Sequence, residues 1–389
     1  MLRKYFRTIL LAWRQLIKQK TRLAVAVVGI AFANIMICTQ MGFEASLFDS
    51  STAPQRSLDT DLVMVSSHFK SVYSLKNFSR ERLYQALGFK GVESVSPLYI
   101  GYGKWRNPLT RRLLSILVFG TDPRTITFKF PEVEQNRSQL QKLNTVLFDQ
   151  GSLPEFGPIA TLLQQRTIVE TELNDVNVRV AGLFTLGASF GAYGNVITSD
   201  STFLHLFPNH HPQQIQIGLI KLQADVYPQQ VAQSLVDDLP DDVMILTNES
   251  FAQAEKAYWA KTTPIGFVFG LGVIVSFIVG IVIVYQIIYA DIADHLPQYA
   301  MLKAIGYSDR YLIVVLIQEA LLLAVLGYIP GFIVSLGLYQ LAATATMLPI
   351  FMTIERGITV FVLTVTMCLI SAFTTMRKLN SADPADVFF

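Results

Sequence analysis

Hydrophobic residues are gathered into four long stretches of the chain. Residues 23–43 and 264–290 contain no charged residue, residues 311–354 contain only Glu319, and residues 357–376 contain none. A helix that crosses the hydrocarbon core of a bilayer needs roughly 20 apolar residues, because its backbone polar groups must pair within the helix. The pattern therefore predicts an integral membrane protein with four transmembrane helices.

The third stretch is longer than one span requires. A helix over residues 311–345 would reach roughly 50 Å, which exceeds one bilayer but is short for two spans and a turn. Pro330 in its middle favours a kink over a hairpin. We therefore expect one span over about residues 312–336 with an extension that projects outward.

Basic residues predict the orientation. Residues 1–22 are rich in Lys and Arg and contain no acidic residue, and Arg377 and Lys378 follow the last stretch. Positive flanks stay in the cytoplasm, so both termini are expected inside and residues 44–263 outside. A signal peptide cleaved after "AFA" (31–33) is the alternative, but the basic region and the apolar run are both longer than usual for one.

The first residues have a helical pattern of their own. Apolar side chains recur at helical spacing, and most basic ones lie on the other face, as in a helix that lies in the membrane interface. The alternative is a basic tail that only sets the topology. The apolar positions are Tyr5, Phe6, Ile9, Leu10, Trp13, Leu16 and Ile17.

The outer region contains the same pattern twice. Residues 61–105 and residues 214–247 each read as strand, helix and strand. This arrangement predicts a split α+β domain, whose sheet is assembled from both ends around an insertion at about residues 125–210. Within the insertion, residues 166–187 read as a hairpin that turns near Asn174-Asp175. Residues 248–264 favour a helix capped by Asn248, and both adjoining spans are expected to continue outward as stalks unless these joints are ordinary loops.

Little in the chain indicates catalysis. There is no G-x-x-x-x-G-K-[ST] phosphate loop and no H-E-x-x-H motif, so we expect no catalytic, cofactor or metal residues. His210-His211 and the Gly-rich "GASFGAYGN" (187–195) read as loops. Cys38 and Cys368 lie within spans. Glu319 is the one ionisable residue predicted inside a span. It is either a structural carboxylate, with Gln318 as a neighbour, or a contact in coupling or dimerisation.

Several motifs resemble one permease family. These are "LAWRQLIKQKTRLAVAVVGIAF" (11–32), "VFGTDP" (118–123), "QYAMLKAIGYSDRYLIVVLIQEALLLAVLG" (298–327) and "NSADPADVFF" (380–389). They resemble MacB/FtsX-type ABC transporter permeases, and most nearly the DevC-type membrane subunit of a cyanobacterial tripartite exporter. The resemblance implies a non-catalytic subunit of the inner membrane with a large periplasmic domain.

The resemblance also implies partners. The sequence itself has a short amphipathic helix between two spans, for which a plain connecting loop is the alternative. By resemblance, a separate ABC ATPase would dock on this helix. Two copies of the ATPase would be present, and they would bind ATP and Mg. The permease would form a homodimer that works with a periplasmic adaptor and a TolC-like outer-membrane duct. The docking residues carried over are Gln298, Tyr299, Met301, Leu302, Lys303, Ala304, Ile305 and the helix-ending Gly306.

The expected function is type VII, MacB-like export of a lipid or glycolipid by mechanotransmission. A lipoprotein-releasing permease and an FtsX-like transmitter that activates a cell-wall hydrolase are the alternatives; an ion-coupled secondary transporter is disfavoured by four spans with one carboxylate.

The expected divisions are 1–22 elbow helix, 23–45 first span and stalk, 46–250 periplasmic domain, 251–290 stalk and second span, 291–311 cytoplasmic coupling loop, 312–345 third span, 346–356 periplasmic loop, 357–376 fourth span and 377–389 cytoplasmic tail.

Overall fold

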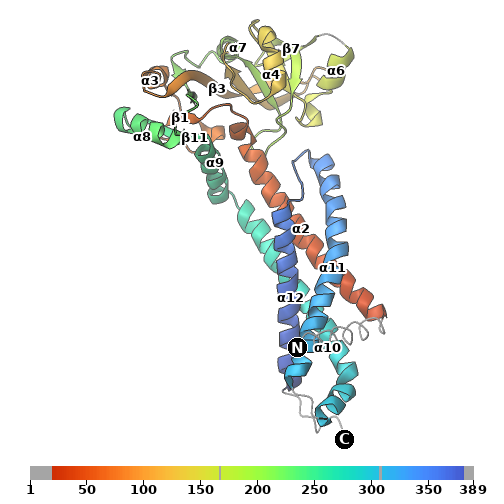
Figure 1. The fold of residues 1–389 in the computed structure, drawn as a ribbon. Coiled ribbons are helices and arrows are strands. Elements are labelled where there is room, and N and C mark those ends of the chain that lie inside the picture. Colours follow the sequence, from red (N-terminus) through yellow and green to blue (C-terminus); the bar gives the residue numbers. More distant parts are fainter. Residues whose placement is uncertain (1–19, 166–167, 306–308, 381–389) are drawn as a thin grey trace. The chain divides into compact units, whose positions relative to one another are not determined.

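The computed structural model describes residues 20–165, 168–305 and 309–380 (Figure 1). The chain divides into two compact units. The first, called here the membrane unit, comprises Met1–Ala45, Ile265–Thr344 and Ile350–Phe389. The second, called here the ectodomain, comprises Ser46–Pro264 and Ala345–Pro349. The predicted interfacial helix over residues 1–22 lies almost wholly outside the described residues.

In the part of the chain that the structure describes, four helices are long and apolar enough to cross a membrane. This confirms the predicted fold class, including a single long helix for the third stretch, with Pro330 inside it. The helices are α2 (Lys20–Arg56), α10 (Ile265–Ala304), α11 (Asp309–Thr346) and α12 (Ile354–Asn380).

Small residues let these four helices approach closely. A Cβ added to Gly280 of α10 would lie 2.0 Å from the sulfur of Met367, and one added to Gly327 of α11 would lie 2.5 Å from Ile30. Apolar side chains from all four helices form a shared core around these contacts. Close backbone approach is a common basis of helix association in membranes, where dispersion contacts replace the hydrophobic effect.

Two hydrogen bonds between polar groups link α12 to neighbouring membrane helices. Thr364 Oγ1 of α12 donates to Asn34 Oδ1 of α2 at 2.6 Å. Ser371 Oγ of α12 donates to the Ile281 carbonyl of α10 at 2.8 Å. These bonds tie α12 to both neighbours.

The two joints between spans and ectodomain differ. On the first side α2 is one helix from Lys20 to Arg56. On the second side α9 (Asn248–Thr262) ends at an extended Thr263, and α10 begins at Ile265. Pro264 accounts for the break, because the residue before a proline is disfavoured in the helical region. The helix N-cap is Thr247, whose side chain accepts from the Ser250 amide, so the predicted cap at Asn248 was wrong by one residue.

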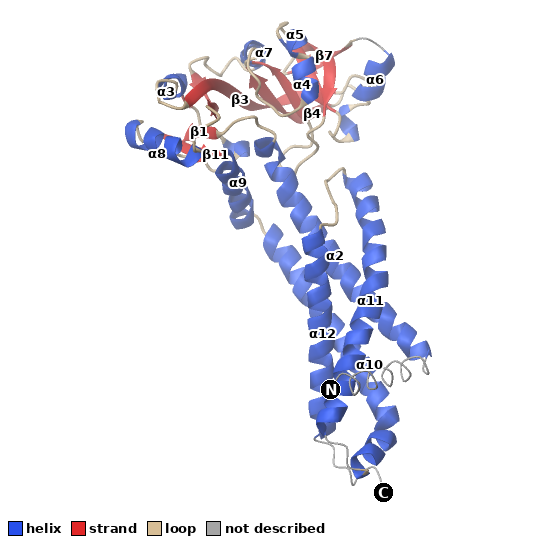
Figure 2. Ribbon diagram, viewed as in Figure 1, coloured by secondary structure: helices blue, strands red, loops and turns tan. Residues whose placement is uncertain are grey.

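The strands belong to the ectodomain (Figure 2). They are β1 (Leu62–Ser66), β2 (Phe78–Ser79), β3 (Val92–Arg106), β4 (Leu113–Thr121), β5 (Thr145–Asp149), β6 (Val169–Leu173), β7 (Val176–Phe184), β8 (Asn195–Ser199), β9 (Gln214–Ile215), β10 (Ile217–Leu222) and β11 (Val243–Thr247). The remaining helices are η1 (Val72–Ser74), α3 (Arg80–Ala86), α4 (Pro131–Gln135), α5 (Arg137–Leu140), η2 (Pro154–Phe156), α6 (Ile159–Gln165), α7 (Asp200–Leu206) and α8 (Pro228–Asp238).

The main sheet has nine strands in the order β11-β1-β10-β3-β4-β8-β5-β7-β6. The two predicted strand–helix–strand units supply β1, α3, β3 and β10, α8, β11. Strand β10 lies between β1 and β3, and β1 lies between β10 and β11, all antiparallel. The sheet is therefore assembled from both ends of the ectodomain, as predicted.

The sheet is buried on both faces. Along β1, Leu62 and Met64 belong to one apolar core, while Val63 and Val65 belong to the other. The predicted hairpin is confirmed as β6 and β7, with Asn174 and Asp175 at φ values of 50° and 61°. Two consecutive positive φ values match the twist of a tight hairpin.

Candidate functional site

The predicted docking segment forms the end of α10. The helix runs without a break through residues 298–304, and Gly306 lies outside the described residues. Met301 and Ile305 are 63% and 70% exposed, and the Ile305 amide donates to the Met301 carbonyl. Two large apolar side chains thus stand in solvent one helical turn apart, which suits a surface that a partner covers.

A charged cluster lies where α2, α10 and α11 meet. Arg22 of α2 forms an ion pair with Asp294 of α10 and also donates to the Ala290 carbonyl at 3.4 Å. Glu319 of α11 is 2% exposed, and its carboxyl lies within hydrogen-bonding reach of the carboxyl of Asp291 of α10. The cluster connects three spans through charged groups.

A small cavity separates the members of this cluster. Its volume is about 20 Å³, and its lining includes Arg22, Asp291 and Glu319. A cavity of this size has room for about one water molecule. Glu319 Oε2 has no hydrogen-bond partner among the described residues. One carboxyl oxygen of the cluster is therefore left without a hydrogen-bond partner among the described residues.

Sequence reasoning found Glu319 but missed its neighbours. Asp291 had been assigned to the coupling loop, and Arg22 to the interfacial helix. In the structure the second membrane helix continues through both of its aspartates, Asp291 and Asp294. Gln318, the neighbour suggested for Glu319, keeps a buried Oε1 without a partner among the described residues. The available signal was the absence of proline between residues 265 and 296.

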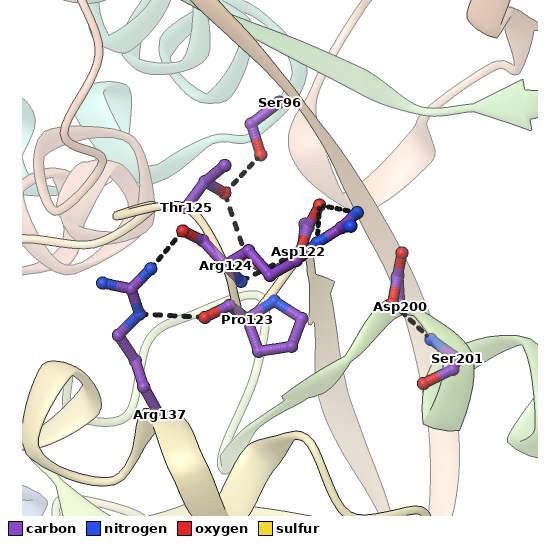
Figure 3. Close-up of polar contacts among 8 residues, drawn as sticks. All are labelled: Ser96, Asp122, Pro123, Arg124, Thr125, Arg137, Asp200 and Ser201. Atoms are coloured by element: carbon purple, nitrogen blue, oxygen red, sulfur yellow. Dashed lines mark hydrogen bonds and ion pairs between the residues drawn. The ribbon is translucent and has the colours of Figure 1, made fainter.

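In the ectodomain, the "VFGTDP" motif ends β4 in a tightly bonded turn (Figure 3). Asp122 accepts from the Arg124 amide at 2.9 Å and from the Arg124 guanidinium at 2.8 Å. Thr125 Oγ1 bonds both the Asp122 carbonyl and Ser96 Oγ of β3. Arg137 donates to the Pro123 carbonyl at 2.9 Å. The motif therefore fixes a turn beside the sheet, which is a structural role.

Two acids near this turn have pKa values shifted in opposite directions. Hydrogen bonding to the Arg124 side chain holds the pKa of Asp122 below its usual value. Burial raises the pKa of nearby Asp200, and the negative charge of Asp122 adds to the rise. The Asp200 carboxyl accepts from the Ser201 amide at the start of α7 (Figure 3).

Glu255 of α9 is a buried acid that the sequence did not indicate. Its carboxylate accepts from Ser71 Oγ at 2.8 Å, from the Val72 amide at 2.7 Å and from Trp259 Nε1 at 2.8 Å. Burial raises its pKa, and these hydrogen bonds oppose the rise. The network pins α9 to the η1 turn of the ectodomain.

The loops predicted around His210-His211 and in the Gly-rich stretch contact neighbouring residues of the ectodomain. His210 packs edge-on against Phe203 and Phe207 and contacts Gln216 at 2.9 Å. The Gly-rich loop bonds to tyrosines: Tyr102 OH donates to the Gly191 carbonyl at 2.6 Å.

The membrane unit allows a comparison with known families. Residues 269–384 match the model of the FtsX-like permease C-terminal domain. The matched part begins in α10 and includes the exposed helix end, Asp291 and Glu319. The chain is thus similar to FtsX-like permeases over its last three membrane helices.

The ectodomain has similar solved structures. One is the periplasmic region of MacB from Actinobacillus actinomycetemcomitans, with 14% identity, a TM-score of 0.36, and coverage of 53% of this chain and 94% of that one. Another is the extracellular domain of the noncanonic ABC-type transporter YknZ from Gram-positive bacteria, with 11% identity, a TM-score of 0.33, and coverage of 48% and 98%. A comparison with curated proteins gives no match.

Proposed function

We propose that this chain is the membrane-spanning, non-catalytic subunit of an ABC-type exporter, driven by a separate ATPase in the cytoplasm. The match of residues 269–384 to FtsX-like permeases carries the proposal. The basic flanks of the spans support a cytoplasmic position for the end of α10 and a periplasmic position for the ectodomain.

The exposed end of α10 is the docking site in this proposal. Met301 and Ile305 provide apolar contact, and Lys303 of the same segment provides charge. A short helix that presents adjacent apolar side chains is suited to a groove on a partner protein. Gln298, Tyr299, Leu302, Ala304 and Gly306 complete the proposed docking segment.

Two copies of the chain would each bind one ATPase, and ATP-driven motion would pass along the helices to the ectodomain. Helix α2 supports this because it is unbroken from Lys20 to Arg56. The close contacts at Gly280 and Gly327 leave little room for cargo between the helices of one copy. The proposed cargo is therefore a lipid or glycolipid taken up outside the membrane and passed to an adaptor and an outer-membrane duct.

Met301→Asp tests the docking site. The chain and an ABC ATPase subunit are reconstituted in nanodiscs, and ATP hydrolysis is measured with and without the chain. A charge at the centre of an apolar contact should lower the stimulation by about tenfold, because one desolvated carboxylate costs more than 1.4 kcal/mol.

Ile354→Asp is the matched control. Ile354 is 86% exposed at the start of α12, at the other end of the spans in the predicted topology, and its substitution should leave the stimulation unchanged. Full stimulation by the Met301→Asp chain would contradict the docking assignment. Proteins that copurify with the chain then distinguish the two functions. An adaptor and an outer-membrane duct would support export, whereas a cell-wall hydrolase would support signalling instead.

A further inference from the structure

The ectodomain contains a cavity of about 190 Å³ that the proposed mechanism does not use. It lies where η1 and the residues after it meet β3 and β4. Its lining includes Tyr73, Asn77, Tyr102, His210 and Gln216. Pockets for drug-sized ligands measure roughly 300–1,000 Å³, so this one suits a ligand of about one ring.

The hydroxyl groups of the two tyrosines are already hydrogen-bonded. Tyr102 OH donates to the Gly191 carbonyl, and Tyr73 OH lies 2.9 Å from Ser189 Oγ, so the Gly-rich loop uses both hydroxyls. A Cβ on Gly191 would come within 2.4 Å of the Tyr73 ring. Glycine is therefore required there, and this loop fixes the positions of the two rings.

The polar side of the cavity is built around Gln216, which is 2% exposed. Its Oε1 accepts from the Ile100 amide at 3.2 Å, and its Nε2 lies 2.8 Å from Asn77 Oδ1 and 2.9 Å from His210 Nδ1. An amide nitrogen only donates, so Nδ1 accepts and the neutral imidazole carries its proton on Nε2. Burial lowers the pKa of His210 in agreement with a neutral ring.

The lining offers aromatic faces and neutral hydrogen-bonding groups together. No Asp, Glu, Lys or Arg lines the cavity among the described residues. A charged ligand would therefore lose its hydration without gaining a countercharge. A sugar ring matches this lining, because its C–H faces pack on aromatic rings while its hydroxyls both donate and accept.

We propose that this cavity binds a single neutral sugar ring. The proposal rests on the proposed export function where the ring is taken to be the headgroup of a glycolipid cargo; a free sugar has the same chemistry. The Val72 and Tyr73 wall is held by Glu255 of α9, and Trp259 of the same helix packs on the Tyr73 ring at 5.7 Å. Binding of a sugar in the cavity would thus alter the contacts of α9, the helix that precedes the second span.

The test uses the full chain in nanodiscs of phosphatidylethanolamine and phosphatidylglycerol, which contain no sugar. Methyl β-D-glucopyranoside is added in one arm and followed by saturation-transfer NMR. In the other arm monoglucosyl diacylglycerol is incorporated into the nanodiscs, and Trp fluorescence is followed. Binding in either arm is expected, and the arms distinguish a free sugar from a lipid headgroup.

Variants localise the binding. Tyr102→Ala should abolish it, whereas Tyr102→Phe keeps the ring and should retain most of it. Asn77→Ala, at an exposed position, removes the acceptor for Gln216 Nε2 and should weaken binding about fivefold. Tyr227→Ala is the control, since Tyr227 is 72% exposed and is not part of the lining.

Absence of binding in both arms overturns the sugar site, as does binding that Tyr102→Ala and Asn77→Ala leave intact. This failure is distinct from failure of the proposed function. If Met301→Asp still removes ATPase stimulation, the permease assignment stands and only the sugar site falls.

Discussion

Buried acids in the two units have contrasting surroundings. In the ectodomain, Asp149 is fully buried and accepts from the amides of Gly151, Leu186 and Gly187 and from the Asn195 side chain. Glu255 is equally well paired. In the membrane unit, Glu319 is nearly as buried but has an oxygen without a partner among the described residues and a second acid beside it.

The different surroundings of these acids indicate different roles in the two units. A carboxylate whose oxygens are all satisfied holds loops in one arrangement, and removing it leaves several donors unpaired. A carboxyl with an unpaired oxygen beside a water-sized cavity and an arginine has hydrogen-bonding capacity that the fold does not use. We infer that the ectodomain acids stabilise the fold, and we propose that the membrane cluster contributes to coupling.

Glu255→Ala should give the largest effect on stability. Its loss leaves the Ser71, Val72 and Trp259 donors without their acceptor, which costs roughly 3 kcal/mol. Hydrogen exchange of the segment around Val72 should accelerate strongly. Glu249→Ala is the control, because Glu249 is exposed on the same helix, and exchange that is alike in the two variants would remove the structural role of Glu255.

Glu319→Gln tests the role of the buried acid in the membrane unit. Glutamine keeps the shape but replaces the carboxyl that lies within hydrogen-bonding reach of Asp291, so stability should change little while ATPase stimulation falls by about tenfold, a typical coupling energy. Glu355→Gln, at an exposed acid of α12, should have no effect on either quantity. A large loss of stability with normal stimulation would make Glu319 a structural acid like Glu255.

The turn of Figure 3 supplies the smallest effect. Arg124 is exposed, so Arg124→Ala should lower the stability only slightly at neutral pH. Because the folded pKa of Asp122 is depressed, its contribution is present above the ordinary value of 3.8 and is lost as pH falls below it.

Thermal unfolding of wild type and Arg124→Ala across this pH range measures the effect. The two should converge in acid, with Arg112→Ala matching wild type throughout. A difference that grows in acid would show that the Asp122 to Arg124 pair does not depress this pKa.

The features that could be predicted depend on long patterns. Four apolar stretches specify four membrane helices, and two strand–helix–strand patterns specify a split sheet, because each uses many residues that agree. The "QIQIGLIKL" pattern predicted one strand, whereas Gln216 interrupts it between β9 and β10 by bonding to the Ile100 amide. A side chain that reaches another strand leaves no local signal.

The membrane cluster could be predicted only in part. Glu319 stands out in an apolar stretch, but its meeting with Asp291 and Arg22 depends on how three helices pack. The Glu255 network joins residues 183 and 184 positions apart, which no local periodicity reveals. The residues carried over for docking, from Gln298 to Gly306, remain a prediction from resemblance.

The topology of the end of α10 and of the ectodomain is the most direct test of the central claim. Single cysteines are placed at Met301 and at Tyr193, both exposed, while Cys38 and Cys368 are buried and serve as the unlabelled background. A membrane-impermeant maleimide is applied to spheroplasts. The account predicts labelling at position 193 from outside and at position 301 only after the membrane is opened; labelling of both from the same side would contradict it.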